Sequence, residues 1–236
     1  ARHQVGAWFD MWQTNAERQS QTVLAGIITR VDGLAYNTMY AIGDTPGRYV
    51  KQHLVPFGEY FPVPGWMRPV FDWLDLPFSD IRTDLDSDRL LFHGDIGMAI
   101  SICFEDLFPS AFAQAARGSG LLVNVTNDAW FRGSLAPDQH LQIARARAAE
   151  NGRPLLRAAN TGISASIGPD GEILDRLEWG QRGRLEVSVQ ARQGNTPFAR
   201  LTNRPLFLLA CLILLGLAAY RIIPVSQPRH TAPSAH

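Results

Sequence analysis

Along the chain, apolar and polar positions alternate between the two-residue period of strands and the longer period of helices. Two apolar runs at 22–30 and 36–43 predict paired strands, because Asp32 and Gly33 between them are typical turn residues. Later segments predict a helix at 137–150 and further strands at 121–126, 154–160, 163–168, 172–177 and 183–190. This alternation predicts an α/β fold in which helices cover β-sheets.

A cysteine stands at the junction of a predicted strand and a predicted helix. Alternate residues from Ile96 to Ile102 are apolar and predict a strand, and 106–117 predicts a helix. The N-terminus of a helix offers unpaired N–H groups and the positive end of a dipole, which stabilise both a thiolate and an oxyanion. Cys103 is therefore a candidate nucleophile for covalent acyl transfer.

A lysine and a glutamate upstream could supply what a thiol alone lacks. Lys51 ends a predicted strand, and Glu59 follows a Pro-Phe-Gly turn that would bring it back towards the lysine. A buried lysine is costly unless it is paired, so such a pair near Cys103 would supply fixed positive charge for an oxyanion. On spacing alone, an ordinary pair of surface residues stays open.

Composition excludes several classes of function. The 236 residues carry 22 basic and 22 acidic side chains, which gives no electrostatic basis for binding nucleic acid. The two cysteines, Cys103 and Cys211, lie far apart in unlike surroundings, so a disulfide framework is not expected. The histidines show no zinc-site spacing, and His53 and His140 are interpreted as hydrogen-bonded structural residues.

The two ends of the chain differ from the domain between them. The apolar segment at 205–223 falls short of roughly 20 uninterrupted apolar residues, but isoleucines extend it past Arg221, whose side chain can reach the membrane interface. We predict a transmembrane helix there, preceded by a linker at 194–204 and followed by a disordered tail at 224–236. Residues 1–22 predict a polar helix that begins in the middle of a domain, so the chain is interpreted as a fragment.

A long segment at 60–89 combines several prolines and aromatic residues with weak periodicity. A loop of this length inside a compact domain is usually functional or disordered. Its aromatic residues form either local core or a lid that meets lipid acyl chains, and both interpretations stay open. These residues are Trp66, Phe71, Trp73 and Phe78.

Several motifs, in a fixed order, carry a resemblance to a known family. The segment KQHLVPFGEYFP at 51–62 and the segment ISICFED at 100–106 are followed by NVTNDAWF at 124–131. They resemble the lysine, cysteine and later motifs of the nitrilase, or carbon–nitrogen hydrolase, superfamily. Within it, the likeness to the apolipoprotein N-acyltransferases covers nearly the whole chain.

This resemblance implies a fold, a reaction and a location. The fold would be a nitrilase-like αββα sandwich at 1–193, lacking its first strand, on the periplasmic side of the bacterial inner membrane. The reaction would move an acyl chain from a phospholipid, through a cysteine thioester, to the α-amine of a lipoprotein's diacylglyceryl-cysteine. The implied partners are a phospholipid donor, a diacylated lipoprotein acceptor and membrane lipid. No metal or other cofactor is implied.

The resemblance also implies roles for individual residues. The family's lysine corresponds to Lys51 and its nucleophile to Cys103, and two further family glutamates correspond to Glu59 and Glu105. The residue after the nucleophile is commonly tyrosine in the family and is Phe104 here. Its backbone N–H can still serve the oxyanion, but any role of a phenol hydroxyl is lost.

The family's general base has no counterpart. That base is a glutamate in a Trp-Pro-Glu-like context, whereas the one glutamate before Lys51 is Glu17, in a polar context that does not match. We therefore expect the base, the first strand and the N-terminal membrane helices to lie upstream of residue 1. The chain would then be the C-terminal part of an enzyme and inactive on its own.

Three residues of the NVTNDAWF motif are expected to brace the site by hydrogen bonding and packing: Asn127, Asp128 and Trp130. Two other functions stay open, a membrane-tethered amidase that hydrolyses a small amide and a non-catalytic binding or assembly module. The aromatic loop and the predicted span favour the acyltransferase, and the presence of both Lys51 and Cys103 favours an active parent enzyme.

Overall fold

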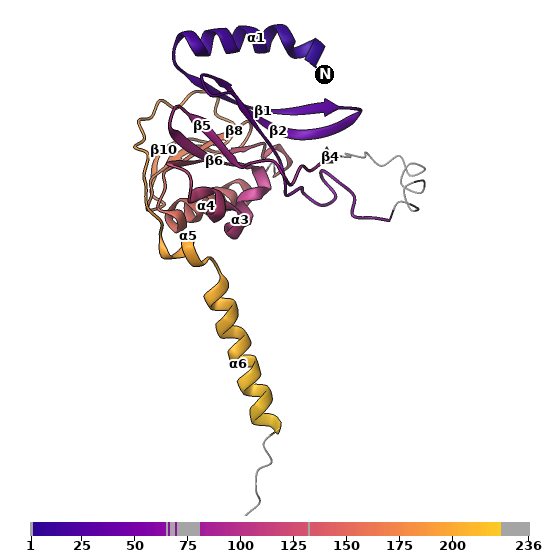
Figure 1. Ribbon diagram of the computed structural model, residues 1–236, viewed down its shortest axis with the longest axis vertical. Helices are drawn as coiled ribbons and strands as arrows, with labels where there is room; N and C mark the ends of the chain where they lie inside the picture. The colour runs from indigo at the N-terminus through magenta and orange to yellow at the C-terminus, as the bar shows by residue number, and fades with distance from the viewer. Residues whose placement is uncertain (1, 65, 67–68, 70–80, 132, 223–236) are drawn as a thin grey trace, which may run out of the picture.

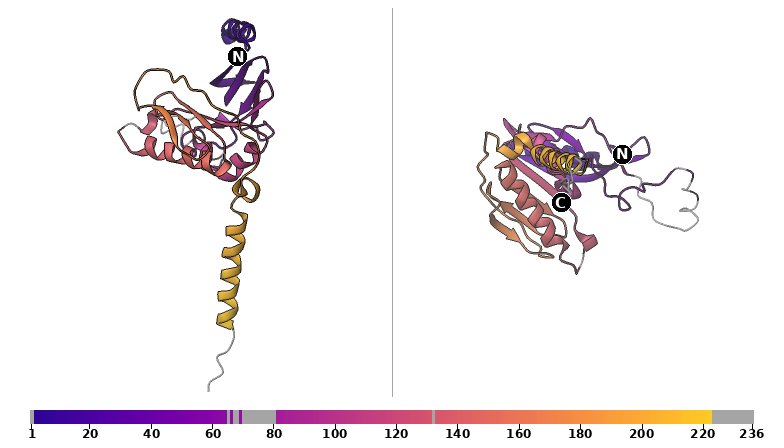
Figure 2. Two further views of the ribbon diagram at one scale, coloured as in Figure 1. Left: turned by 90° about the vertical axis from the view of Figure 1, so that its left-hand side faces the viewer. Right: turned by 90° about the horizontal axis from the view of Figure 1, so that it is seen from below.

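The computed structural model describes residues 2–64, 66, 69, 81–131 and 133–222. These residues form four layers in the order helix, sheet, sheet and helix, as Figures 1 and 2 show. The layering agrees with the predicted αββα sandwich.

The first sheet lies under helix α1 (Arg2–Arg18), which contacts β2 and β1. Its strands have the order β1-β2-β3, and β4 pairs with β2 in parallel. The predicted turn between the first two strands is present, with Asp32 and Gly33 both at positive φ (51° and 81°). Such a two-residue turn matches the twist of a hairpin. The strands are β1 (Thr22–Val31), β2 (Leu34–Gly43), β3 (Gly47–Val50) and β4 (Ile81–Arg82).

The second sheet has the strand order β10-β9-β8-β7-β6-β5. Its strands are β5 (Leu90–His93), β6 (Ile96–Ile102), β7 (Leu121–Thr126), β8 (Leu155–Ala159), β9 (Ser164–Ile167) and β10 (Ile173–Leu177). The helices beside it are the 3₁₀ turns η2 (Cys103–Leu107) and η3 (Ala129–Phe131), and α3 (Pro109–Ala116) and α4 (Ala136–Asn151). Because β6, β7 and β8 run parallel, their carboxyl ends meet at one edge of the sheet. In open α/β sheets this edge commonly carries the functional site.

The alternation along β6 explains how one strand serves two layers. Met98, Ile100 and Ile102 pack between the sheets against Met39 of the first sheet, whereas Ala99 faces the helices α3 and α4. Successive side chains of a strand point to opposite faces, so a strand covered on both faces is apolar almost throughout. This arrangement fixes the end of β6, and with it Cys103, between two packed cores.

Two predicted elements differ in the structure. Residues 183–190 form no strand and are mostly exposed. The helix predicted at 106–117 is split, because Phe108 (φ −100°, ψ 82°) is not helical and Pro109 occupies the first turn of α3. Proline suits that position, where its missing N–H is not needed.

The segment predicted as a linker, 194–204, contains a docked helix. Helix α5 (Pro197–Leu201) is capped by Thr196, whose hydroxyl accepts from Ala199 N at 3.0 Å, and it contacts α3 and α4. Ala199 is buried, and the guanidinium of Arg153 donates to the carbonyl oxygens of Ser119 and Gly194. Side chains of the sandwich therefore hold this segment in place.

Helix α6 (Arg204–Ile222) extends away from the sandwich (Figure 1). Its apolar side chains are exposed, with Leu206 at 70% and Phe207 at 73%. Within the residues that the structure describes, no helix has both the length and the apolar character that crossing a membrane requires. The span predicted at 205–223 is thus not confirmed. Residue 223 and the tail predicted at 224–236 lie outside the described residues.

Candidate active site

Cys103 lies at the turn between β6 and η2, as predicted, and its backbone has a positive φ of 53°. A non-glycine residue in this left-handed region costs about 1–2 kcal/mol. Strain of this kind persists only where surrounding contacts hold it, and it is frequent at active sites. The thiol is half-buried and belongs to no disulfide.

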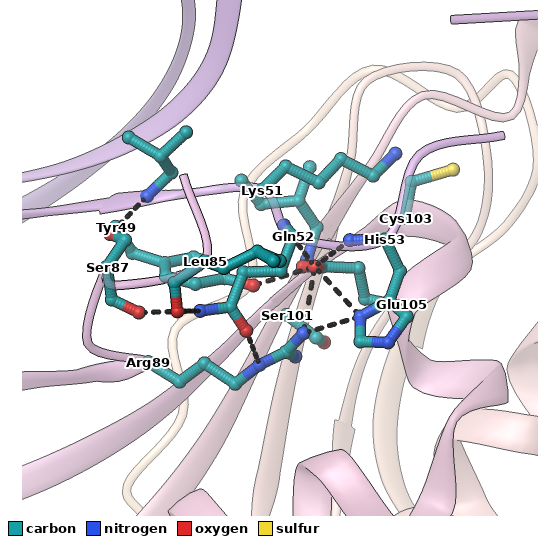
Figure 3. A network of polar contacts seen from close by, with 12 residues as sticks. Tyr49, Lys51, Gln52, His53, Leu85, Ser87, Arg89, Ser101, Cys103 and Glu105 are labelled. Atoms are coloured by element: carbon teal, nitrogen blue, oxygen red, sulfur yellow. Dashed lines mark hydrogen bonds and ion pairs between the residues drawn. The ribbon is translucent and has the colours of Figure 1, made fainter. Parts of the chain in front are cut away.

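Lys51 follows directly after β3 and is 1% exposed. Its Nζ lies 2.7 Å from Oε2 of Glu59, so the predicted contact between these residues is present. Figure 3 shows the side chains of Lys51 and Cys103 extending towards the same side of the polar network around Glu105. A buried ammonium with one carboxylate partner is a fixed positive charge in surroundings that screen it weakly.

The turn between Lys51 and Glu59 holds the carboxylate in this position. Phe57 has a φ of 62°, and the Glu59 N–H donates to the Val55 carbonyl at 2.9 Å. The Glu59 carboxylate in turn accepts from the Val55 N–H at 2.8 Å and from Asn37 Nδ2 at 3.0 Å. One donor precedes the turn and the other belongs to β2, so the orientation of Glu59 does not depend on Lys51 alone.

Glu105, two residues after the cysteine, is fully buried. Burial would raise the pKa of its carboxyl, but the neighbouring His53, the charge of Arg89 and hydrogen bonds from Tyr49 and Ile102 outweigh burial and lower the pKa. Donors to its two oxygens are the Tyr49 hydroxyl (2.6 Å), the Arg89 guanidinium (3.0 Å) and the N–H groups of Gln52 (2.9 Å), His53 (3.1 Å) and Ile102 (2.9 Å). Glu105 thus ties β3, the segment after Lys51 and the end of β6 together (Figure 3).

A second buried network lies on the other side of the cysteine turn. Asp106 and Asp128 are fully buried, and the His140 ring lies between them, 3.1 Å and 3.0 Å from their carboxylates. Arg157 donates to Asp128 at 2.9 Å and to Asn124. The network joins η2, the loop after β7, β8 and α4, and Asn124 Nδ2 reaches the Cys103 carbonyl at 3.5 Å.

The three residues predicted to brace the site have different surroundings. Asp128 is buried in the network, and Gly162 approaches it so closely that a Cβ there would lie 2.2 Å from Oδ2. Asn127 is exposed and accepts from the Thr161 hydroxyl at 2.9 Å, which connects two loops. Trp130 is 82% exposed on η3, so the prediction that it packs against the site is wrong.

A cleft of about 560 Å³ lies beside the cysteine turn. Aromatic side chains line much of it, including Tyr60, Phe61, Phe104 and Phe108, and the His53 ring stacks on Phe108 at 4.2 Å. Such an apolar lining with a few polar groups is typical of ligand sites. The cleft thus offers an apolar ligand a place beside Phe104, the residue that follows the cysteine.

The long segment at 60–89 helps to line this cleft, through Tyr60, Phe61 and residues 81–83. Of its four predicted aromatic residues, Trp66 is 77% exposed and so is not local core. The other three, Phe71, Trp73 and Phe78, lie outside the described residues. Among the described residues, no group of His, Cys, Asp and Glu side chains could hold a metal ion.

Several residues of the two networks were not predicted from the sequence. Asn124 and Arg157 interrupt apolar runs that form buried strands, and a polar group in such a position needs a partner. That signal could have identified them. Tyr49 and Arg89 gave no comparable signal, since each could equally lie at a surface. His140 was interpreted as a hydrogen-bonded structural residue, and its burial and its contacts with Asp106 and Asp128 agree with this.

Comparison with protein families shows that residues 3–197 match the model for carbon–nitrogen hydrolases. The chain is 41% identical to an apolipoprotein N-acyltransferase of Nitrosomonas europaea over 216 residues, which cover 87% of the chain and 42% of the relative. It is 39% identical to the apolipoprotein N-acyltransferase of Ralstonia nicotianae, covering 89% of the chain and 41% of the relative. The chain therefore spans about two fifths of the length of these curated relatives.

Solved structures show the same fold. A carbon–nitrogen hydrolase from Helicobacter pylori G27 superposes with a TM-score of 0.57 at 15% identity, covering 75% of the chain and 65% of that structure. A mutant of the amidase from Nesterenkonia sp. AN1 gives a TM-score of 0.56 at 18% identity, covering 90% and 77%. The latter structure is described as showing the result of Michael addition of acrylamide at the active site cysteine.

Proposed function

The chain belongs to the carbon–nitrogen hydrolase family, and we propose that it carries the nucleophile of an apolipoprotein N-acyltransferase. The observation that carries this proposal is the 41% identity to a curated enzyme of that name over 87% of the chain. The strained cysteine, its neighbouring lysine–glutamate pair and the aromatic cleft support the same conclusion.

The proposed reaction is a two-step acyl transfer. The Cys103 thiolate attacks the carbonyl carbon of a phospholipid ester, and the alkoxide of the lysophospholipid leaves as a thioester forms. The α-amine of a lipoprotein's diacylglyceryl-cysteine then attacks the thioester, the thiolate leaves, and an amide remains. A phospholipid and a diacylated lipoprotein are thus the proposed partners, and neither step requires a metal or a cofactor.

The buried Lys51 is the proposed source of positive charge for the oxyanion of each tetrahedral intermediate, together with the backbone N–H of Phe104. Glu59 pairs with the ammonium and holds it in place. Glu105 was predicted as a catalytic residue. Because it is fully buried, with both oxygens already accepting hydrogen bonds, we assign it a positioning role instead.

The proposed location is the periplasmic face of the bacterial inner membrane. The exposed leucine and phenylalanine side chains of α6 support contact with lipid at that end of the molecule. The aromatic cleft, which residues of the segment at 60–89 help to line, supports a role of that segment as a lid over a bound acyl chain.

The experiment that tests the function uses a phospholipid labelled in its acyl chain. The full-length enzyme that contains this chain should form a hydroxylamine-sensitive adduct on Cys103, located by peptide mass spectrometry, and should pass the label to a diacylated lipopeptide. Cys103→Ser should abolish both steps, whereas the control Cys211→Ser should retain them. Label that persists in Cys103→Ser would contradict the proposal.

A second candidate is an amidase that hydrolyses a small amide. The structural likeness to the Nesterenkonia amidase favours it, since that match covers 90% of the chain. Both functions form an acyl-enzyme on the cysteine, but an amidase passes the acyl group to water, whereas the acyltransferase passes it to an amine. Release of ammonia from a water-soluble amide, without transfer to a lipopeptide, would favour the amidase.

A further inference from the structure

Two side chains from outside the cysteine turn reach the backbone carbonyl of Cys103. His140 Nε2 lies 3.4 Å from this oxygen, and Asn124 Nδ2 donates to it at 3.5 Å. His140 belongs to α4 and Asn124 to β7, so two packed elements hold the same peptide group. That group belongs to the residue whose φ of 53° determines where the thiol points.

The His140 ring is a cation in this position. Its Nδ1 lies 3.0 Å from Asp128 Oδ1 and its Nε2 lies 3.1 Å from Asp106 Oδ1. An ionised carboxylate can only accept, so both ring nitrogens donate and the ring carries two protons. Burial would lower the pKa of His140, but the hydrogen bonds to Asp106 and Asp128 outweigh burial and raise the pKa to about 9.

The charges around His140 balance. Asp106 faces it from η2, Asp128 from the loop after β7, Arg157 from β8 and Arg147 from its own helix. Arg157 lies 2.9 Å from Asp128 and 3.6 Å from Asp106, so two carboxylates meet two cations, while Arg147 pairs with the half-buried Glu150. If His140 lost its proton, the network would keep an uncompensated buried negative charge.

We propose that His140 is the positioning residue of the nucleophile. As a cation fixed between Asp106 and Asp128, it holds the Cys103 carbonyl and keeps the cysteine in its left-handed conformation, with the thiol presented to the substrate. This inference rests on the proposed role of Cys103 as nucleophile. His140 is itself buried and does not meet the substrate, so its loss slows the chemistry at sulfur and leaves substrate affinity unchanged.

The first test measures the reactivity of Cys103 towards acrylamide, in the 236-residue chain with Cys211→Ser so that one thiol remains. His140→Gln is expected to lower the rate of alkylation at pH 7 at least tenfold in folded protein and to leave the rate in urea unchanged. The matched control is His93→Gln, because the His93 side chain bonds the Thr22 hydroxyl at an exposed position. This control should react like the parent. A folded His140→Gln protein that reacts at the parent rate overturns the proposal.

The second test uses the pH profile, which a merely structural histidine would not affect. In the parent, the alkylation rate should rise as the thiol ionises and then fall below a single-ionisation curve near pH 9, with circular dichroism confirming the fold. Asp128→Asn keeps a hydrogen-bond acceptor for the His140 ring but removes a negative charge beside it. The pH at which the alkylation rate departs from the single-ionisation curve should therefore be at least one unit lower in this variant. The proposal is overturned if the departure occurs at the same pH in Asp128→Asn as in the parent, or if the parent profile shows no departure.

If His140→Gln does not fold, the pH profile of Asp128→Asn alone tests the proposal. Because alkylation by acrylamide requires neither a phospholipid nor a lipoprotein, these measurements are independent of the proposed acyl transfer. Failure of acyl transfer with an intact effect of His140 would reject the proposed function only. Normal acyl transfer without an effect of His140 would reject the positioning role only.

Discussion

The Lys51 ammonium lies 2.7 Å from the Glu59 carboxylate, yet the two side chains are exposed to different extents, 1% and 15%. Glu59 also accepts from Asn37 and from the Val55 N–H, whereas Lys51 is buried directly after β3. A buried charge that loses its partner costs about 3–5 kcal/mol. A partly exposed carboxylate that keeps two donors loses much less. The pair therefore predicts an asymmetric response to mutation.

Glu59→Gln is expected to lower the free energy of unfolding by about 3 kcal/mol, because the amide leaves a buried ammonium unpaired. Lys51→Met should lower it by about 1 kcal/mol or less, since only one of three donors to Glu59 is lost. Both changes should slow acylation of Cys103 about 100-fold or more, because Lys51→Met removes the charge that stabilises the oxyanion and Glu59→Gln removes the carboxylate that holds this charge in place. Urea unfolding and intact-mass detection of the acyl-enzyme measure the two effects.

The control for this pair is Arg184→Met, which breaks the exposed contact with Glu186 and should change neither quantity. Equal losses of stability in Glu59→Gln and Lys51→Met would contradict the asymmetry. Near-normal acylation in both would leave the pair with a structural role alone.

Glu105→Gln is expected to lower the free energy of unfolding by about 3–5 kcal/mol, because the buried Arg89 then lacks its carboxylate. Tyr49→Phe removes one donor of several and should cost about 1 kcal/mol. Comparing the stability of Glu105→Gln with its rate of acylation separates a positioning role of Glu105 from a catalytic one. A stable Glu105→Gln protein that cannot be acylated would show that Glu105 takes part in the chemistry.

The parts of the site that could be predicted from the sequence are those formed by neighbouring residues. The end of β6 fixes Cys103, and the turn through Phe57 returns Glu59 to Lys51, so each contact follows from a short segment. The network around His140 could not be predicted in this way. Its members come from η2, α4, β8 and the loop after β7, and local periodicity does not determine which of these elements lie together.

One expectation was wrong, and one segment has more structure than was expected. Trp130 was expected to pack because it is a large aromatic residue within a motif, but a motif does not determine which way a side chain on a loop turns. The segment at 194–204 was interpreted as a linker because it lies between the predicted domain and the predicted span. The Thr196 cap and the buried Ala199 show that a short helix can dock through very few contacts.

The stability of the protein should fall as the pH rises from neutral to alkaline. The pKa of His140 is about 9 in the folded protein, against about 6.5 for an ordinary histidine, so the folded state binds this proton more tightly. Its contribution is fully present below pH 6.5 and is lost as the pH rises through 9. At 1.36 kcal/mol per unit, the loss amounts to about 3 kcal/mol. Melting temperatures at pH 6, 7.5 and 9.5 measure it.

The same change should be absent from His140→Gln, whose melting temperature should vary little over this range. On the acid side the slope reverses, because the pKa of Asp128 is lowered and its contribution is lost as the pH falls through that value. A parent protein whose melting temperature is flat between pH 6.5 and 9.5 would contradict the charge assigned to His140.

The last prediction concerns the general base. Among the described residues, the carboxylates at the site are Glu59, Glu105, Asp106 and Asp128, and each is already engaged. Glu17 lies on the exposed side of α1 and accepts from Gln13 at 2.5 Å, so it does not reach the cysteine turn. The described part of the chain thus offers the thiol a positive charge but no free base.

The 236-residue chain should therefore react with acrylamide, which needs only a thiolate, and yet form the acyl thioester very slowly. Loss of a general base typically slows a reaction 10²–10⁴-fold. The measurement compares thioester formation from a labelled phospholipid in this chain and in a full-length enzyme that contains it, with acrylamide alkylation of Cys103 as the control for folding. Equal rates of thioester formation would identify Glu59 as the base, because it is the one partly exposed carboxylate beside Lys51 among the residues described. In that case Glu59→Gln would abolish acylation in the isolated chain, while Lys51→Met would retain part of it.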